Sequence, residues 1–298
     1  MKAVFLDLAS LAEPALDLAG LQGVADAGRR YPAPAAEDRV ARIADADVVV
    51  TNKVVLDEAV LRAAPNLKLV CLTATGFNNV SVETARELGV VVSNVVAYAT
   101  DSVAQHVFAL MLAHHTSLFS YTDAVKRGDW SRSAQFCLLD YPVRELRGMT
   151  LGVVGFGELG QGVARIAEAF GMQVLVSQRP GGAPAPGRTP FEDLLRRSDV
   201  ITLHVPLLDN THHLIDARAL ALMKPTALLI NTARGAVVDN LALADALRRG
   251  VIGGAAMDVL DVEPPPLDHP LLAQDIPLLI ITPHAAWAGR QARQKVVD

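Results

Sequence analysis

Short apolar runs alternate with amphipathic stretches along almost the whole chain. In the N-terminal third, runs rich in Val, Ile and Leu predict strands at 3–8, 47–51, 67–73 and 90–93. The stretches between them predict helices at 36–44, 57–64 and 81–88. Continuous apolar runs separated by helices are typical of a parallel sheet that is buried on both faces. We therefore predict a first α/β domain at 1–98.

A second series of strands starts after residue 148. Its apolar runs lie at 149–154, 172–177, 200–204, 226–231, 253–257 and 278–282. The stretch DSVAQHVFALMLAHHTS predicts a helix over 101–117 that links the two series, with Asp101 or Ser102 as its N-cap. The fold class is therefore α/β, with two parallel-sheet domains of the Rossmann-like or flavodoxin-like kind. We place the second domain at 99–285 and treat 286–298 as a candidate addition to the first.

Two segments depart from this alternation. Residues 118–148 are polar and aromatic, and they are longer than an ordinary connection in a compact domain, so they are expected to have a function of their own. Residues 180–187 form a tract rich in Pro and Gly that predicts turns.

Composition and charge restrict the class of protein. Hydrophobic residues make up 51% of the 298 residues and charged residues 20%, which excludes a disordered chain. The net charge of -5 offers no basic face for nucleic acid or anionic lipid, and no apolar run has the length of a membrane span. Asp7 interrupts the first apolar run, so a secretory signal is not supported. Cys71 and Cys137 lie in apolar sequence and predict buried free thiols, which suit the cytoplasm.

Three glycines follow the first strand of the second series in the pattern GxGxxG. Gly155, Gly157 and Gly160 come after MTLGVV and open a predicted helix at 158–170. This context is typical of dinucleotide binding, because the glycines allow a tight turn and a close approach to a pyrophosphate at the helix N-terminus.

The residues after the next strand bear on the choice of cofactor. An acidic residue there would bind the ribose 2'-hydroxyl of NAD, but the chain has Ser177, Gln178 and Arg179. Arg179 is placed to meet a 2'-phosphate, so NADP(H) is favoured over NAD(H). The alternative is that Arg179 is a solvated surface residue and Gln178 bonds the ribose.

Polar residues also follow the later strands. Arg234 follows TALLIN, Asp258 and Glu263 follow GGAAM, and His284 follows LLIITP. Arg234, Glu263 and His284 together could bind a carboxylate, orient an imidazole and transfer a proton. Taken singly, they could be a surface ion pair, a loop residue and a buried histidine.

Other chemistries find little support. His106, His114 and His115 share one predicted helix without the spacing of four that metal ligands need, and His212 and His213 are neighbours, so no metal site is expected. A GxSxG nucleophile motif is also absent.

The motifs LGVVGFGELG, LINTARGAVVD, AMDVLDVEP and TPHAAW, in this order, resemble those of the D-isomer-specific 2-hydroxyacid dehydrogenases. The resemblance implies an active site in the cleft between two domains, the first of which binds substrate. It implies that Arg234 binds the substrate carboxylate and carbonyl, that His284 is the acid/base paired with Glu263, and that Asp258 holds the nicotinamide carboxamide.

The loop TATGFNNV would bind the substrate carboxylate through the backbone of Thr75 and Gly76, although many relatives have Asp where this chain has Asn78 and Ser81. The cofactor contacts expected on this basis are Gly155, Gly157, Glu158, Leu159, Gly160, Gln178, Arg179, Val205, Pro206, Thr232 and Asp258.

Within that family, Trp287 and the stretch RSAQFCLLDYPVREL resemble the glycerate dehydrogenases, also called hydroxypyruvate reductases. Trp287 is therefore expected to contact a small 2-keto or D-2-hydroxy acid, and the resemblance implies hydroxypyruvate or glyoxylate. Trp287, Gln135 and Phe136 could equally be packing residues in a core or dimer interface.

The resemblance also bears on assembly. Dimers of the family exchange the arm after the linking helix, which implies a homodimer formed through 118–148. The predicted helix ARQKVVD runs to Asp298, whereas relatives usually continue and return this helix to the first domain, so either the sequence is truncated or it lacks that clasp. A cofactor-sensing regulatory protein on the same fold is the alternative to an enzyme.

Overall fold

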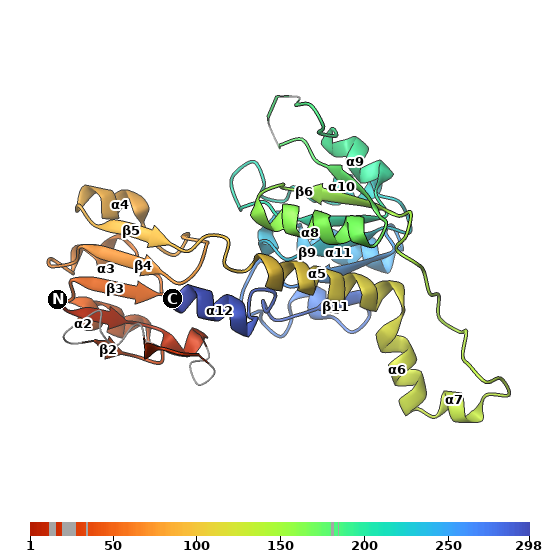
Figure 1. Cartoon of the computed structure of the whole chain (residues 1–298), viewed down its shortest axis with the longest axis horizontal. Coiled ribbons are helices and arrows are strands. Elements are labelled where there is room, and N and C mark those ends of the chain that lie inside the picture. The colour runs from red at the N-terminus through yellow and green to blue at the C-terminus, as the bar shows by residue number, and fades with distance from the viewer. Residues whose placement is uncertain (12–15, 20–27, 34, 180–181, 184) are drawn as a thin grey trace. The chain divides into compact units, whose positions relative to one another are not determined.

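The computed structural model describes residues 1–11, 16–19, 28–33, 35–179, 182–183 and 185–298. The chain divides into two compact units, which are shown in Figure 1. Unit 1 consists of 1–99 and 288–298, and unit 2 of 100–287. Part of the predicted turn tract 180–187 lies outside the described residues.

Unit 1 is built on a parallel sheet with the strand order β2-β1-β3-β4-β5. The strands are β1 (Ala3–Phe5), β2 (Arg29–Arg30), β3 (Val48–Thr51), β4 (Leu69–Leu72) and β5 (Val91–Asn94). The helices are η1 (Leu8–Leu11), η3 (Ala36–Asp38), α2 (Arg39–Ile43), α3 (Glu58–Arg62), α4 (Val82–Glu87) and α12 (Arg290–Val297). Among the described strands of unit 1, β2 was not predicted, because its two arginines are exposed and carry no apolar pattern.

Apolar side chains of the strands and helices form the core of unit 1. Val49, Val70 and Leu72 come from the sheet, and Ile43 and Leu61 come from the helices that cover it. These side chains are almost completely removed from water. Their burial explains why the short apolar runs were reliable signals for strands.

Unit 2 is built on a six-stranded parallel sheet with the order β11-β10-β9-β8-β6-β7. The strands are β6 (Thr150–Val154), β7 (Gln173–Val176), β8 (Val200–Leu203), β9 (Leu228–Asn231), β10 (Gly254–Met257) and β11 (Leu279–Ile281). Its helices are α5 (Thr100–His115), α6 (Leu118–Lys126), α7 (Asp129–Arg132), α8 (Glu158–Ala169), α9 (Phe191–Arg197), α10 (Ala217–Leu222), α11 (Asn240–Arg248), η4 (Gly235–Val237) and η5 (Pro270–Leu272). The prediction of two parallel-sheet α/β domains is confirmed.

The chain of unit 2 reverses direction across the sheet after β6. It first runs outward to β7 and then returns to β8 on the other side of β6. Beyond β7, Thr189 forms a parallel bridge with Ser177, so the segment before α9 extends this edge of the sheet. A reversal of this kind opens a crevice at the carboxyl ends of the two strands next to it, where ligands of open α/β sheets bind.

Helices α5 and α8 pack closely against each other in unit 2. A Cβ added at Gly162 of α8 would lie 2.7 Å from the Thr100 side chain of α5, so only glycine fits without a shift. Because α5 already starts at Thr100, Asp101 and Ser102 lie within its first turn. The predicted N-cap at Asp101 or Ser102 is therefore wrong, although an acidic residue still suits a helix N-terminus.

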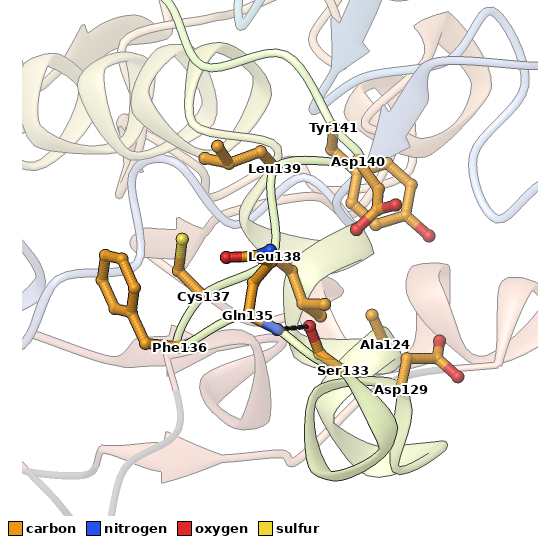
Figure 2. A pocket seen from close by; sticks show the side chains of 10 residues that line it. All are labelled: Ala124, Asp129, Ser133, Gln135, Phe136, Cys137, Leu138, Leu139, Asp140 and Tyr141. Atoms are coloured by element: carbon orange, nitrogen blue, oxygen red, sulfur yellow. Dashed lines mark hydrogen bonds between the residues drawn. The ribbon is translucent and has the colours of Figure 1, made fainter.

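The segment 118–148 forms an arm of unit 2 that contains α6, α7 and an irregular return to β6 (Figure 1). Residues of α6, α7 and the return line a cavity of about 720 Å³, which Figure 2 shows from close by. Phe136 and Leu139 on its rim are 89% and 86% exposed. Cys71 in β4 and Cys137 on this arm are free thiols, as predicted, but both are half-buried rather than buried. No helix in the described part of the chain is both long and apolar enough to cross a membrane.

Candidate active site

The predicted cofactor and catalytic residues of unit 2 lie along one edge of its sheet. All six strands are parallel, so the segments that follow them lie at the same edge in the order of the strands. Those segments carry Gln178 and Arg179 after β7, Gly155 to Gly160 after β6, Val205 and Pro206 after β8, Thr232 and Arg234 after β9, Asp258 after β10, and His284 after β11. Residues that are far apart in the sequence are therefore collected in a single row.

The glycine turn after β6 has two tightly packed positions and one open position. Gly155 has φ +92°, and a Cβ there would lie 2.4 Å from the carbonyl oxygen of His204. A Cβ at Gly160 would lie 2.1 Å from the carbonyl oxygen of Gly155. A Cβ at Gly157 would meet no atom within 4 Å, and Gly157 directly precedes the first residue of α8. The turn therefore leaves open space in front of a helix N-terminus, which favours an anion.

The turn after β9 holds the backbone of Arg234. Asn231 is completely buried, and its side-chain amide donates to the carbonyl oxygen of Arg234 at 2.9 Å and accepts from the backbone N–H of Ala233 at 3.0 Å. A Cβ at Gly235 would lie 1.9 Å from the backbone of Leu260, so glycine is required there. The half-buried Arg234 donates one hydrogen bond from Nη1 to the carbonyl oxygen of Ala233. Most of the donors of its guanidinium fork remain for other partners.

Asp258 after β10 fixes the turn after β11. Its side chain is 1% exposed and accepts hydrogen bonds from the hydroxyl of Thr282 at 2.5 Å and from the backbone N–H groups of Ala285 and Ala286 at 2.9 Å each. Burial raises the pKa of Asp258, but the hydrogen bonds from His106, Thr282 and the two backbone groups outweigh it, so the net shift is downward. The carboxylate therefore holds the backbone on either side of His284 in a fixed position.

His284 and Glu263 form a close polar pair at this edge. His284 Nδ1 lies 2.6 Å from Glu263 Oε2, and the side chains are 27% and 35% exposed. Because a carboxylate only accepts, Nδ1 is the donor, and Nε2 is left to gain or lose the exchangeable proton. Oε1 of Glu263 accepts from the backbone N–H of Leu260 at 3.0 Å, which orients the carboxylate. His284 also has φ +51°, a left-handed backbone conformation that is uncommon outside glycine.

A second network holds the loop that carries Glu263. Asp261 accepts hydrogen bonds from Asn240 at the start of α11 at 2.5 Å and from His269 Nε2 at 2.7 Å. His269 is 4% exposed, and its Nδ1 accepts from the backbone N–H of Leu271, so the proton lies on Nε2. Burial raises the pKa of Asp261, but the hydrogen bonds from His269 and Asn240 lower it by more, so the net shift is downward.

The predicted substrate loop of unit 1 lies at the carboxyl end of β4. The hydroxyl of Thr75 donates to the carbonyl oxygen of Val95 at 2.8 Å, and Asn94 donates to the carbonyl oxygen of Thr75 at 2.7 Å. Among the described residues, the backbone N–H groups of Thr75 and Gly76 donate to no acceptor. The loop is thus braced by its side chains while two backbone donors remain open to a ligand.

Comparisons with known proteins agree with this arrangement. The family model of the D-isomer specific 2-hydroxyacid dehydrogenase, NAD binding domain, matches residues 108–286. The glycerate dehydrogenase of Methylorubrum extorquens is 44% identical over 88% of this chain and 82% of its own, and the hydroxypyruvate reductase of Blautia hydrogenotrophica is 36% identical over 100% and 94%. The chain belongs to the D-isomer-specific 2-hydroxyacid dehydrogenase family.

Solved structures of similar proteins hold a nicotinamide cofactor. D-lactate dehydrogenase from Aquifex aeolicus, complexed with NAD and lactic acid, matches with TM-score 0.82 and 30% identity over 99% of this chain and 93% of its own. An acyclic imino acid reductase in complex with NADPH and D-Arg matches with TM-score 0.86 and 26% identity over 100% and 94%. Unit 2 therefore contains the nicotinamide dinucleotide-binding domain of this dehydrogenase family.

The residues of this dehydrogenase fit such a cofactor. The space at Gly157 suits a pyrophosphate, because a Cβ built there would meet no atom of the described residues within 4 Å. Oγ1 of Thr232, a predicted cofactor contact, is buried without a hydrogen-bond partner among the described residues, so a bound ligand could satisfy it. No group of metal-binding side chains occurs in the described part of the chain.

The structure shows protein contacts of some of the residues that were predicted to bind a ligand. Asp258 faces the turn that carries His284 with both carboxylate oxygens, so its contact with the carboxamide stays a prediction beside a clear positioning role. Gln178 donates its side-chain amide to the carbonyl oxygen of Gly182 at 2.6 Å, which commits that donor within the loop. Arg179 is exposed, and Trp287 is half-buried, so their assigned ligands also stay predictions.

Sequence reasoning missed the residues that hold the site together. His106 Nε2 lies 3.0 Å from Thr282 Oγ1, and Asn231 and His269 hold the turns described above. Polar residues inside otherwise apolar strand ends, such as Asn231 at the end of TALLIN, were the available signal. The link between His269 and Asp261 had no signal in the local pattern.

Proposed function

We propose that this dehydrogenase reduces small 2-keto acids with NADPH, and that hydroxypyruvate and glyoxylate are its preferred substrates. The single observation that carries the reaction class is the pair of His284 and Glu263, 2.6 Å apart, at the edge that also presents Arg234. The substrate class is supported by the names of the glycerate dehydrogenase and hydroxypyruvate reductase relatives and by Trp287 three residues after His284.

The proposed role of each residue follows from the geometry of these side chains. When bound, the reduced nicotinamide supplies a hydride to C2 of the keto acid. Arg234 binds the substrate carboxylate with its free donors and orients the carbonyl group. His284 donates a proton from Nε2 to the keto oxygen as negative charge develops there. Glu263 keeps Nδ1 engaged and favours the charged imidazolium before the proton is transferred.

The backbone N–H groups of Thr75 and Gly76 are proposed as further donors to the substrate carboxylate. The hydroxyl and carbonyl contacts of Thr75 brace the loop without using these N–H groups. Asn78 and Ser81 carry no charge, so this role depends on the backbone alone.

The choice of NADPH is supported by the absence of a carboxylate after β7 and by the exposed Arg179. Nearby acids are engaged elsewhere, since Glu192 pairs with Arg196 and Arg218. A 2'-phosphate would therefore meet positive rather than negative side chains. A cytoplasmic location and a homodimer formed through 118–148 complete the proposal.

The test is a panel of 2-keto acids with both cofactors, followed by nicotinamide absorbance. Hydroxypyruvate and glyoxylate should be reduced with higher kcat/KM than phenylpyruvate, and NADPH should be preferred to NADH. His284→Gln should lower turnover by about 10²- to 10⁴-fold, the usual contribution of a positioned proton donor, with cofactor affinity retained. Saturable cofactor binding without turnover of any 2-keto acid would instead support the regulatory alternative.

A further inference from the structure

Arg188 lies next to the glycine turn although it is distant from it in sequence. Its guanidinium carbon is 5.0 Å from the centroid of the Phe156 ring, and Phe156 stands between Gly155 and Gly157. A guanidinium over an aromatic face is held by the quadrupole of the ring and keeps its edge donors available. The glycine turn therefore carries a fixed cation beside it.

The backbone next to Arg188 is fixed to the end of β7. Thr189 donates from its N–H to the carbonyl oxygen of Val176, and Gln178 donates to the carbonyl oxygen of Thr189, both at 2.8 Å. The two segments thus form a short parallel pairing, Ser177 with Thr189. This pairing places Arg188 beside the strand end that carries Arg179, where the adenosine ribose of a dinucleotide binds.

Neither arginine is neutralised by the described part of the protein. Both side chains are exposed, and among the described residues neither Arg179 nor Arg188 forms an ion pair. In contrast, Arg196 on the following helix α9 pairs with Glu192 and Asp193. Two unpaired guanidinium groups therefore flank the position of the ribose.

We propose that Arg188 is a specificity-determining residue that binds the 2'-phosphate of NADPH together with Arg179, with Phe156 as the platform that orients its guanidinium. This inference rests on the proposed use of NADPH. It adds a residue that follows β7 by twelve positions and would be assigned to a loop from the sequence alone. A planar guanidinium can give two hydrogen bonds to a phosphate, and a second arginine strengthens discrimination against the 2'-hydroxyl.

The inference can be tested with the purified full chain by calorimetric titration, without turnover. Adenosine 2',5'-bisphosphate and 5'-AMP serve as probes that differ only in the 2'-phosphate. Arg188→Ala should weaken the bisphosphate by about 10-fold and leave 5'-AMP within about 2-fold, since the lost contacts are to the 2'-phosphate alone. Phe156→Leu should weaken the bisphosphate to a smaller extent, because the guanidinium loses its platform but remains present.

Arg197→Ala is the matched control, because Arg197 is another exposed arginine on the nearby α9 and its loss changes the net charge equally. It should leave both affinities unchanged. Equal weakening by Arg188→Ala and Arg197→Ala would show a general charge effect and overturn the inference. An unchanged bisphosphate affinity in Arg188→Ala, with the wild-type preference intact, would also overturn it and leave the proposed function standing. A wild-type chain that binds 5'-AMP as tightly as the bisphosphate would contradict the NADPH proposal itself.

Discussion

The contact between Glu263 and His284 places one carboxylate oxygen on Nδ1 and leaves Nε2 for the reaction. A side chain that can donate as well as accept would preserve the shape of this contact without its charge. Glu263→Gln therefore separates the electrostatic contribution of the carboxylate from its role in orientation.

For Glu263→Gln we expect the alkaline fall in reductive turnover to move toward lower pH, because the charged imidazolium loses an opposite charge. The oxidative limb should move in the same direction. Plots of kcat against pH in both directions provide the measurement, and Asp268→Asn, an exposed position outside the site, provides the control. Coincident profiles for the wild type and Glu263→Gln would remove Glu263 from this role.

At the scale of elements, the loop from 258 to 272 depends on contacts with α11. Asp261 connects Asn240 and His269, and the same loop carries Glu263 two residues later. The side chain of Asp261 is 41% exposed, whereas His269 is almost fully buried, so the histidine is the more rigid half of this link.

Replacing His269 with Ala should loosen this loop and lower kcat by about 10-fold, because a misplaced Glu263 no longer holds His284 in its productive orientation. The KM for the cofactor should change little, and the pH profile should move toward that of Glu263→Gln, which a purely structural loss would not produce. His212→Ala is the control, since His212 is exposed and stacks on its neighbour His213. A proportional loss of folded protein and activity, with the pH profile unmoved, would refute the positioning role.

The elements themselves were largely predictable, whereas the links between them were not. Each predicted strand is present, and the buried ones carry a clear pattern because parallel strands buried on both faces must be apolar. The glycine turn and the strand ends also placed Gly155, Arg234 and His284 at one edge. Arg188 and His269 could not be placed, since their partners Phe156 and Asp261 are joined to them by tertiary folding, which leaves no periodic pattern in the sequence.

At the scale of the whole molecule, the arm exposes large apolar side chains to solvent. Phe119, Trp130, Phe136 and Leu139 are each at least half exposed, although a Trp or Phe gains free energy when it is buried. The two rim residues Phe136 and Leu139 belong to the return segment in Figure 2. Such a surface is typical of one that is covered in an assembly.

We therefore expect a particle of twice 31.7 kDa in light scattering after size-exclusion chromatography. The double substitution Phe136→Asp and Leu139→Asp should shift it toward the monomer, because two charges would be buried at an apolar contact. Val55→Asp and Leu88→Asp, at exposed apolar positions of unit 1, should leave the mass unchanged. A wild-type monomer at micromolar concentration would contradict the proposed dimer.

Two half-buried histidines of unit 2 make the stability of the folded chain sensitive to acid. Burial lowers the pKa of His114 to about 4, with further lowering by His115 and Arg144, and burial alone lowers the pKa of His204 to about 4. The unfolded chain titrates near 6.5, so it binds more protons than the folded chain between pH 6.5 and 4. The free energy of unfolding should therefore decrease as pH is lowered across this window.

Each of these histidines contributes a slope of at most ~1.4 kcal/mol per pH unit. The melting temperature should fall between pH 6.5 and 4, and the double variant His114→Gln and His204→Asn should show a flatter dependence. Asp258 acts at lower pH, because its folded-state pKa is depressed and its contribution is lost only as pH falls through that value. Identical slopes for the wild type and the double variant would exclude these histidines as the source.

The left-handed backbone at His284 limits how far selection can raise the thermal stability of this protein while its turnover is kept. Most residues other than Gly and Asn are destabilised in that conformation by on the order of 1 kcal/mol or more, whereas Gly and Asn adopt it readily. His284→Asn and His284→Gly should therefore raise the melting temperature by a few degrees while turnover is lost. A laboratory evolution experiment that rewards only thermal tolerance should enrich these two residues at 284, whereas one that also requires turnover should retain histidine. If both variants have a lower melting temperature than the wild type, the left-handed conformation of His284 does not reduce the stability of the folded chain.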